Sequence, residues 1–172
     1  MGGKRGDYLV EQAWSIEVFD GGNFARFYKR LDEAERAVTD AAIEHVLASL
    51  GIEICATEWG KSLGKGLYEL RIRRDLGTIL QEYGPPDLGD EIPQGWRKKR
   101  VLIRVYCTFY GRKVVLLLGG YNKLRNPSRK QEQKEIRAAR AALDAGEEPS
   151  RHLLVCDKTH NIAQDARSGG CG

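Results

Sequence analysis

The sequence contains few of the residues that hold small domains together through disulfides or metal ions. Its 172 residues include four cysteines and three histidines, and no two cysteines form a CxxC pair. We therefore expect reduced thiols rather than a disulfide framework. The longest run of apolar side chains, residues 114–118, is far too short to cross a membrane. Residues 1–7 are mostly glycine and charge, unlike a signal peptide. These features predict a cytoplasmic protein without a membrane partner.

Residues that could bind a metal ion gather only near the end of the chain. His152, Cys156, His160 and Cys171 are of the types that zinc prefers. The surrounding segment is glycine-rich and has little apolar support, so a stable metal cage is not expected there. The sequence therefore predicts no metal site and no cofactor.

The charges are segregated, although the formal net charge is only +4. Basic residues cluster at 97–100, between 61 and 74, and between 123 and 134, whereas acidic residues concentrate at 32–58, 82–91 and 144–148. Such segregation favours one positive surface that suits a phosphate backbone. The alternative is an ordinary solvated face of lysines and arginines.

Hydrophobic periodicity predicts the order strand, helix, helix, three strands, helix. Strands are expected at residues 14–18, 67–73, 101–109 and 114–118, and helices at 24–31, 32–50 and 128–146. Asp32 and Glu35 have the spacing of a capping box. Gly119 and Gly120 are expected to turn the backbone out of the last strand.

This order predicts an α+β fold, with one antiparallel sheet, two N-terminal helices packed as a hairpin on one face, and a C-terminal helix. The domain is expected to span residues 12–146, with a surface insertion at about 76–98 that is rich in glycine, proline and acid. A flexible lead (1–11) and a polar, mobile tail (147–172) are expected on either side.

Arginines inside the predicted strands are candidates for chemistry. Arg71 and Arg73 share one strand face, and Arg104 shares a face with Tyr106. A rigid strand holds a guanidinium in place, and its fork grips phosphate. RNA cleavage by the 2′-hydroxyl needs a base, cations around phosphorus and an acid, but no metal. The alternative is that these arginines only cover the sheet and pair with Glu69.

Several segments resemble one protein family. GLYELRI at residues 66–72 resembles the GLYELR strand of HigB-like, phage-derived toxins in the RelE/ParE superfamily of type II toxins. IRVY (103–106), VVLLLGGYNK (114–123), NPS (126–128) and WSIEV (14–18) stand where that family has its other motifs, and Glu135, Ile136 and Ala139 follow. The resemblance covers residues 12–146 and rests on the order and spacing of the pieces.

The resemblance implies a site as well as a RelE-like fold. Arg71 and Arg104 match arginines of the family's RNA-facing cleft, and Tyr121 or Tyr106 would act as the base or stack on a nucleobase. The expected RNA contacts are Lys61, Lys65, Arg73, Lys123, Arg129 and Lys130. Gly119 stands where the family often has a histidine, so any acid or base role of that histidine must fall to another residue.

The function implied by the resemblance is a metal-independent, ribosome-associated mRNA endoribonuclease. Its partners would be mRNA, the ribosome and a cognate helix-turn-helix antitoxin. Two alternatives remain open: a ParE-like inhibitor of DNA gyrase with the same fold, and a degenerate, non-enzymatic module that binds nucleic acid or a partner. Gly119 favours the degenerate module, whereas Arg71, Arg104 and Lys123 favour the nuclease.

Overall fold

The computed structural model describes residues 13–86 and 91–146. The expected flexible lead, the expected tail and the zinc-type residues His152, Cys156, His160 and Cys171 lie outside these residues. Among the described helices, none has both the length and the apolar character needed to span a bilayer.

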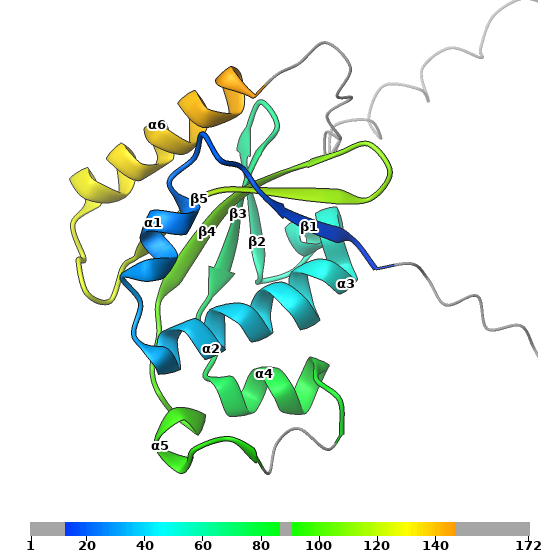
Figure 1. Ribbon diagram of the computed structural model, residues 1–172, viewed down its shortest axis with the longest axis vertical. Helices are drawn as coiled ribbons and strands as arrows, with labels where there is room; N and C mark the ends of the chain where they lie inside the picture. Colours follow the sequence, from blue (N-terminus) through cyan, green and yellow to red (C-terminus); the bar gives the residue numbers. More distant parts are fainter. Residues whose placement is uncertain (1–12, 87–90, 147–172) are drawn as a thin grey trace, which may run out of the picture.

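The fold is α+β, as predicted, and is built on one five-stranded sheet with the order β1-β5-β4-β3-β2 (Figure 1). The strands are β1 (Ser15–Val18), β2 (Gly60–Gly64), β3 (Leu67–Ile72), β4 (Ile103–Tyr110) and β5 (Val114–Asn122). The predicted antiparallel sheet is wrong in one respect, because β1 runs parallel to β5. No hairpin joins these two strands: the chain between them carries every element from α1 to β4, so a parallel pair is permitted.

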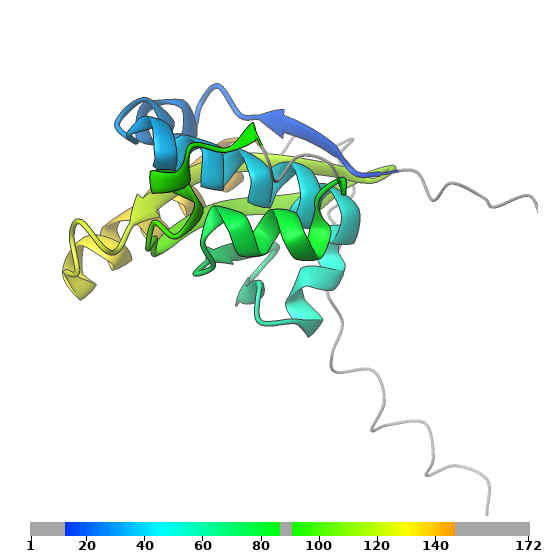
Figure 2. The ribbon, with the colours of Figure 1, turned by 90° about the horizontal axis from the view of Figure 1, so that it is seen from below.

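Helices cover both faces of the sheet. The main core lies under the α1 (Phe24–Lys29), α2 (Glu33–Ala41) and α4 (Leu76–Tyr83) side, and a smaller core lies under α6 (Arg129–Ala145) (Figure 2). Strand alternation sorts the side chains, so that Tyr68, Leu70 and Ile72 enter the main core. Their neighbours Glu69 and Arg71 consequently face the α6 side.

The predicted second helix is confirmed, including both of its ends. Asp32 caps α2 by accepting a hydrogen bond from the Glu35 amide at 2.9 Å, and Glu35 returns the capping box. The helix continues through a π-helical turn, η1 (Ala42–Leu47), and α3 (Ala48–Leu50). It stops at Gly51, whose φ of 53° a side chain would disfavour.

The surface insertion that the sequence predicts at 76–98 is wrong for its first part, residues 76–83. The segment forms α4 and α5 (Gln94–Arg97), and α4 buries Leu76, Ile79 and Leu80 in the main core against α2. Asp75 caps α4 by accepting from the Thr78 amide at 3.0 Å. Helix α4 is therefore part of the domain's hydrophobic core, whereas residues 84–86 and 91–98 are mostly exposed.

The last strand also departs from the prediction, because β5 continues through Gly119 and Gly120 to Asn122. A bulge places one extra residue between the pairs Tyr106–Gly119 and Cys107–Leu117. A Cβ on Gly120 would lie 2.2 Å from the Phe27 ring. This glycine serves the close approach of α1 to the sheet rather than a turn.

Candidate functional site

A cationic pocket of about 380 Å³ lies between the α6 side of the sheet and the start of α6. It brings together six of the ten residues that the sequence singles out: Lys61, Arg71, Arg73, Arg104, Lys123 and Arg129. These side chains come from β2, β3, β4, the segment after β5 and α6. Two carboxylates, Glu69 and Glu132, complete the charged lining.

The floor of the cationic pocket is organised around one buried carboxylate. Glu69 Oε1 lies 2.8 Å from Nε of Arg71 and 3.4 Å from Nε of Arg104. The Glu69 side chain is only 5% exposed. Because both arginines approach it through Nε, Arg71 keeps its two terminal nitrogens for a ligand. The alternative that the strand arginines pair with Glu69 thus holds for Arg71 and Arg104 but not for Arg73, and the pairing also orients Arg71.

Arg71 and Arg104 are directly opposite each other on β3 and β4. Like charges in that position repel, so Glu69 is needed between them. The Arg104 side chain is 6% exposed and Arg71 is 25% exposed. Burial lowers the pKa of Arg104 below its ordinary value, while Glu69 acts in the opposite direction. Arg71 therefore offers the more accessible guanidinium, with Arg104 as a second charge behind it.

The other carboxylate stands on the first turn of α6. Glu132 Oε2 lies 3.1 Å from Nζ of Lys123, and the Glu132 side chain is 15% exposed. Unlike Glu69, Glu132 has no arginine partner among the described residues. Of the two carboxylates of the pocket, Glu132 is the more exposed, and its ion-pair partner is a single lysine.

Tyr106 does not take the place that the sequence assigns to it. The side chain is fully buried in the α6-side core with Leu67, Leu118 and Ala139, and it does not line the cationic pocket. Its hydroxyl is buried and has no hydrogen-bond partner in the described residues. Burial raises the pKa of Tyr106 strongly. A buried, neutral phenol can neither stack on a base nor accept a proton from RNA.

Tyr121 is likewise separated from the cationic pocket. Its hydroxyl contacts the Asn126 carbonyl and lies 3.0 Å from the Ser128 carbonyl oxygen, so it ties the segment after β5 to the start of α6. Burial raises the pKa of Tyr121. The ring borders a different groove, between α1 and α6. Tyr121 therefore has a structural role in the segment that carries Lys123.

Two expected RNA contacts lie away from the pocket lining. Lys65 sits in the β2–β3 turn with φ of 49°, and Lys130 is exposed on α6. Arg140 reaches that turn from α6 and donates to the Leu63 and Gly64 carbonyls at 3.0 and 2.8 Å. The turn and α6 are thereby held together at one end of the site.

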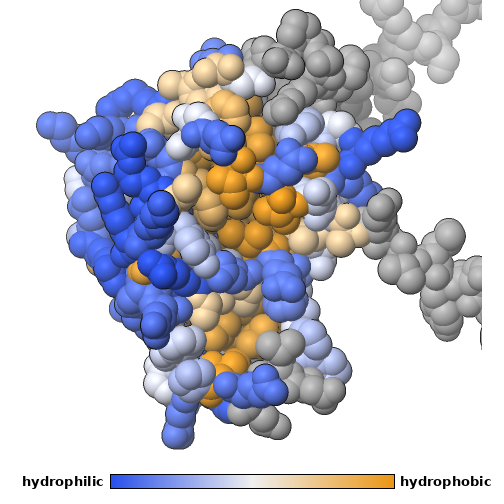
Figure 3. Space-filling view, in the orientation of Figure 1, coloured by the Kyte–Doolittle hydropathy of each residue, from blue (hydrophilic) through white to orange (hydrophobic). Residues whose placement is uncertain are grey.

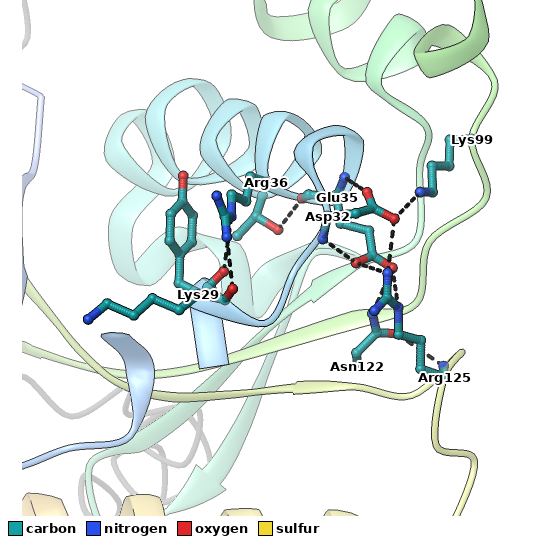
Figure 4. Close-up of polar contacts among 9 residues, drawn as sticks. Lys29, Asp32, Glu35, Arg36, Lys99, Asn122 and Arg125 are labelled. Atoms are coloured by element: carbon teal, nitrogen blue, oxygen red, sulfur yellow. Dashed lines mark hydrogen bonds and ion pairs between the residues drawn. The ribbon is translucent and has the colours of Figure 1, made fainter. Parts of the chain in front are cut away.

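A polar network fixes the segment after β5 from the other side (Figure 4). Arg125 lies 2.9 Å from Asp32 and 2.8 Å from Glu35, and Asn122 donates to Glu35 at 2.9 Å. Lys99 also bonds to Asp32. The bond from Lys99, aided by the Glu35 amide and Arg125, holds the pKa of Asp32 below its usual value. The network joins the start of α2 to the segment that presents Lys123.

Glu69 and Glu132 are the site residues that sequence reasoning missed as functional groups. Alternation on β3 could have placed Glu69 beside Arg71, but nothing local marks Glu132, because its role depends on how α6 docks. Within residues 13–86 and 91–146, no group of three or more His, Cys, Asp or Glu side chains is arranged to hold a metal ion.

Comparison with known proteins adds no relative: no family model, no curated protein and no solved structure matches the chain.

Proposed function

We propose that this chain is an endoribonuclease that cleaves mRNA through the RNA's own 2′-hydroxyl, and that it acts as the toxin of a toxin–antitoxin pair. The observation that carries the proposal is the charge of the pocket. Six cationic side chains and two carboxylates line it, an excess of four positive charges on a protein of net charge +4. Such a site fits the phosphodiester backbone.

The first step is binding of the scissile phosphate. Arg71 is anchored through Nε to Glu69 at 2.8 Å, so its terminal nitrogens form a fork of fixed direction. Arg104 adds a buried charge behind it, and Arg73, Lys61 and Arg129 contribute further positive charge to the lining. Preorganised cations of this kind stabilise the extra negative charge on the pentavalent phosphorus.

The second step is proton transfer, for which Glu132 is the best-placed acceptor. Its carboxylate takes the 2′-hydroxyl proton as the 2′-oxygen bonds to phosphorus and the bond from phosphorus to the 5′-oxygen breaks. The leaving 5′-oxygen takes a proton from the Lys61 or Lys123 ammonium group. The products are a 2′,3′-cyclic phosphate and a 5′-hydroxyl. The 2′-oxygen is the nucleophile, so this route needs no metal-bound water.

The proposal extends to the partners that the resemblance of residues 12–146 implies. The ribosome would present mRNA to the pocket in the cytoplasm, and a helix-turn-helix antitoxin would neutralise the enzyme. The support for these partners is the resemblance of the sequence segments, whereas the support for phosphate binding is the pocket itself.

Inducible expression in a bacterial host tests the proposal. Wild type should arrest growth and create new mRNA 5′ ends, and Arg71→Ala and Glu132→Gln should each reduce cleavage at least about 100-fold, the usual effect of losing a preorganised group. Arg112→Ala is the matched control, because Arg112 is exposed in the β4–β5 turn and does not line the pocket.

Other outcomes contradict the proposal in different ways. Growth arrest without RNA cuts, equal in wild type and Arg71→Ala, would favour a gyrase inhibitor of the same fold. A well-folded chain that causes no arrest would favour a non-enzymatic binding module. If Arg71→Ala loses cleavage but Glu132→Gln is fully active, the proposed phosphate site stands and Glu132 is not the base.

A further inference from the structure

A second cavity, of about 500 Å³, lies between α1 and α6. We call it the α1–α6 groove. The two helices pack on opposite faces of β5: Phe27 of α1 lies against Gly120, and Ala139 of α6 lies beside Gly119. Figure 2 shows α1 and the start of α6 on either side of the end of this strand. Gly120, Tyr121 and Asn122 line the bottom of the groove.

The bottom of the groove is a sheet edge without a strand partner. β1 pairs with β5 only at residues 114–117, and no other described strand flanks residues 119–122 on that side. The Lys123 amide donates to the Leu102 carbonyl beyond the start of β4 at 2.8 Å. In an antiparallel ladder, the backbone N–H groups of successive residues point alternately toward the neighbouring strand and away from it. Since the Lys123 amide points toward β4, the amides of Asn122 and Gly120 point away from β4, toward the open edge. An open edge is a template for an added strand.

The walls of the groove carry cations without an ion-pair partner in the part of the chain that the structure describes. Arg26 on α1, Arg30 directly after α1 and Lys134 on α6 make no ion pair with any described residue. The acid in the lining, Glu135, accepts a hydrogen bond from Gln131 at 2.7 Å. Figure 3 shows strongly hydrophilic side chains along the margin that α1 and α6 form. The groove is therefore complementary to negative charge.

The chemistry of the groove favours a peptide over RNA. Single-stranded RNA is usually held by exposed aromatic rings that stack on bases. Phe27 and Tyr121 line the groove but are 9% and 5% exposed, and the Tyr121 hydroxyl is already engaged with backbone carbonyls. A peptide strand, in contrast, can pair with the edge amides and place alternate side chains toward the two helices.

We propose that the α1–α6 groove binds an extended, acidic segment of a partner protein, which pairs with the open edge of β5 and is held by Arg26, Arg30 and Lys134. This inference does not depend on RNA cleavage. It requires only the edge, the groove and the unpaired cations.

Selection from a displayed library of random ten-residue peptides on the full chain tests the proposal. Acidic peptides should be enriched, and fluorescence anisotropy with a synthetic copy of the best one should give at least tenfold weaker binding to the double variant Arg26→Glu, Arg30→Glu. Both residues are exposed, Arg26 on α1 and Arg30 directly after it, so the fold should survive. Arg112→Glu, at the exposed β4–β5 turn and outside both lining sets, should bind the peptide as wild type does. Bound peptide should also slow hydrogen exchange of the Asn122 amide.

Four results would overturn the proposal. The library selection enriches no peptide, or the double variant binds the peptide as tightly as wild type does. An oligoribonucleotide, but not the peptide, protects the Asn122 amide, or the chain self-associates in a way that requires Arg26 and Arg30. The last result would assign the groove to a second copy. Failure of the RNA-cleavage proposal would leave all of these measurements unchanged, because none of them uses the cationic pocket.

Discussion

Replacing Glu69 by glutamine should destabilise the whole domain. The carboxylate is 5% exposed and lies 2.8 and 3.4 Å from the Nε atoms of Arg71 and Arg104. Without it, the Arg104 guanidinium, 6% exposed, stays buried and loses its ion-pair partner, and only the more distant charge of Glu132 remains. Breaking a buried pair in this way costs about 3–5 kcal/mol. Glutamine keeps one oxygen acceptor, so we expect the lower end, about 3 kcal/mol, out of a total of about 5–15 kcal/mol.

Urea unfolding followed by circular dichroism measures this effect. With an m-value of about 2 kcal/mol per molar, the midpoint should fall by about 1.5 M. Glu58→Gln is the matched control, since Glu58 pairs with Arg74 on the surface and its loss should leave the midpoint unchanged. The double variant Glu69→Leu, Arg104→Met should recover much of the loss, because an apolar pair removes the uncompensated charge. Equal midpoints for Glu69→Gln and Glu58→Gln would refute the role of Glu69 as the buried counter-charge.

Three further predictions follow from the packing and from the shifted pKa values. Gly120→Ala should lower the free energy of unfolding in urea by about 1–3 kcal/mol, because the added Cβ would lie 2.2 Å from the Phe27 ring. Gly119→Ala is the control and should be tolerated, since the nearest atom to its Cβ would be 3.7 Å away. Equal losses of stability in the two variants would contradict this packing. Because the pKa of Asp32 is lowered on folding, its charge stabilises the protein at neutral pH and this contribution is lost as the pH falls through the folded value. Asp32→Asn keeps the helix cap, so its unfolding free energy should fall below that of wild type at pH 7 and converge on it only as the pH falls below the lowered pKa of Asp32. A gap that does not depend on pH would count against the ion pair. Burial raises the pKa of Cys107, so mass spectrometry after iodoacetamide treatment at pH 8 should find it unmodified in the native protein and alkylated in urea.

Local patterns were enough to predict most of the elements. Alternation placed Val105, Cys107 and Phe109 of β4 on the main-core face, and the capping box located the start of α2. Other elements have no such local signal. β2 reads Gly-Lys-Ser-Leu-Gly and forms because β3 offers it an edge. α4 was hidden by the glycine and proline around it, and its helix is stabilised by burial against α2.

The site shows the same division between local and tertiary information. Strand alternation correctly placed Arg71 and Arg104 on one face, which is why they meet in the pocket. It could not distinguish an open position from a covered one, so Tyr106, on the same face as Arg104, was expected in the cleft although α6 buries it. The bulge in β5 was also invisible, and the position of Tyr121 beside the α1–α6 groove depends on it.

Helix α6 links the two proposed sites, because it forms one wall of each. Glu132 and Ile136 face the cationic pocket, whereas Lys134 and Ala138 face the α1–α6 groove. The 17 residues of the helix form one hydrogen-bonded rod. Substitutions on α6 can therefore be assigned to one site or the other by the face that they change: Lys134→Glu alters the charge of the α1–α6 groove, whereas Glu132→Gln alters the cationic pocket.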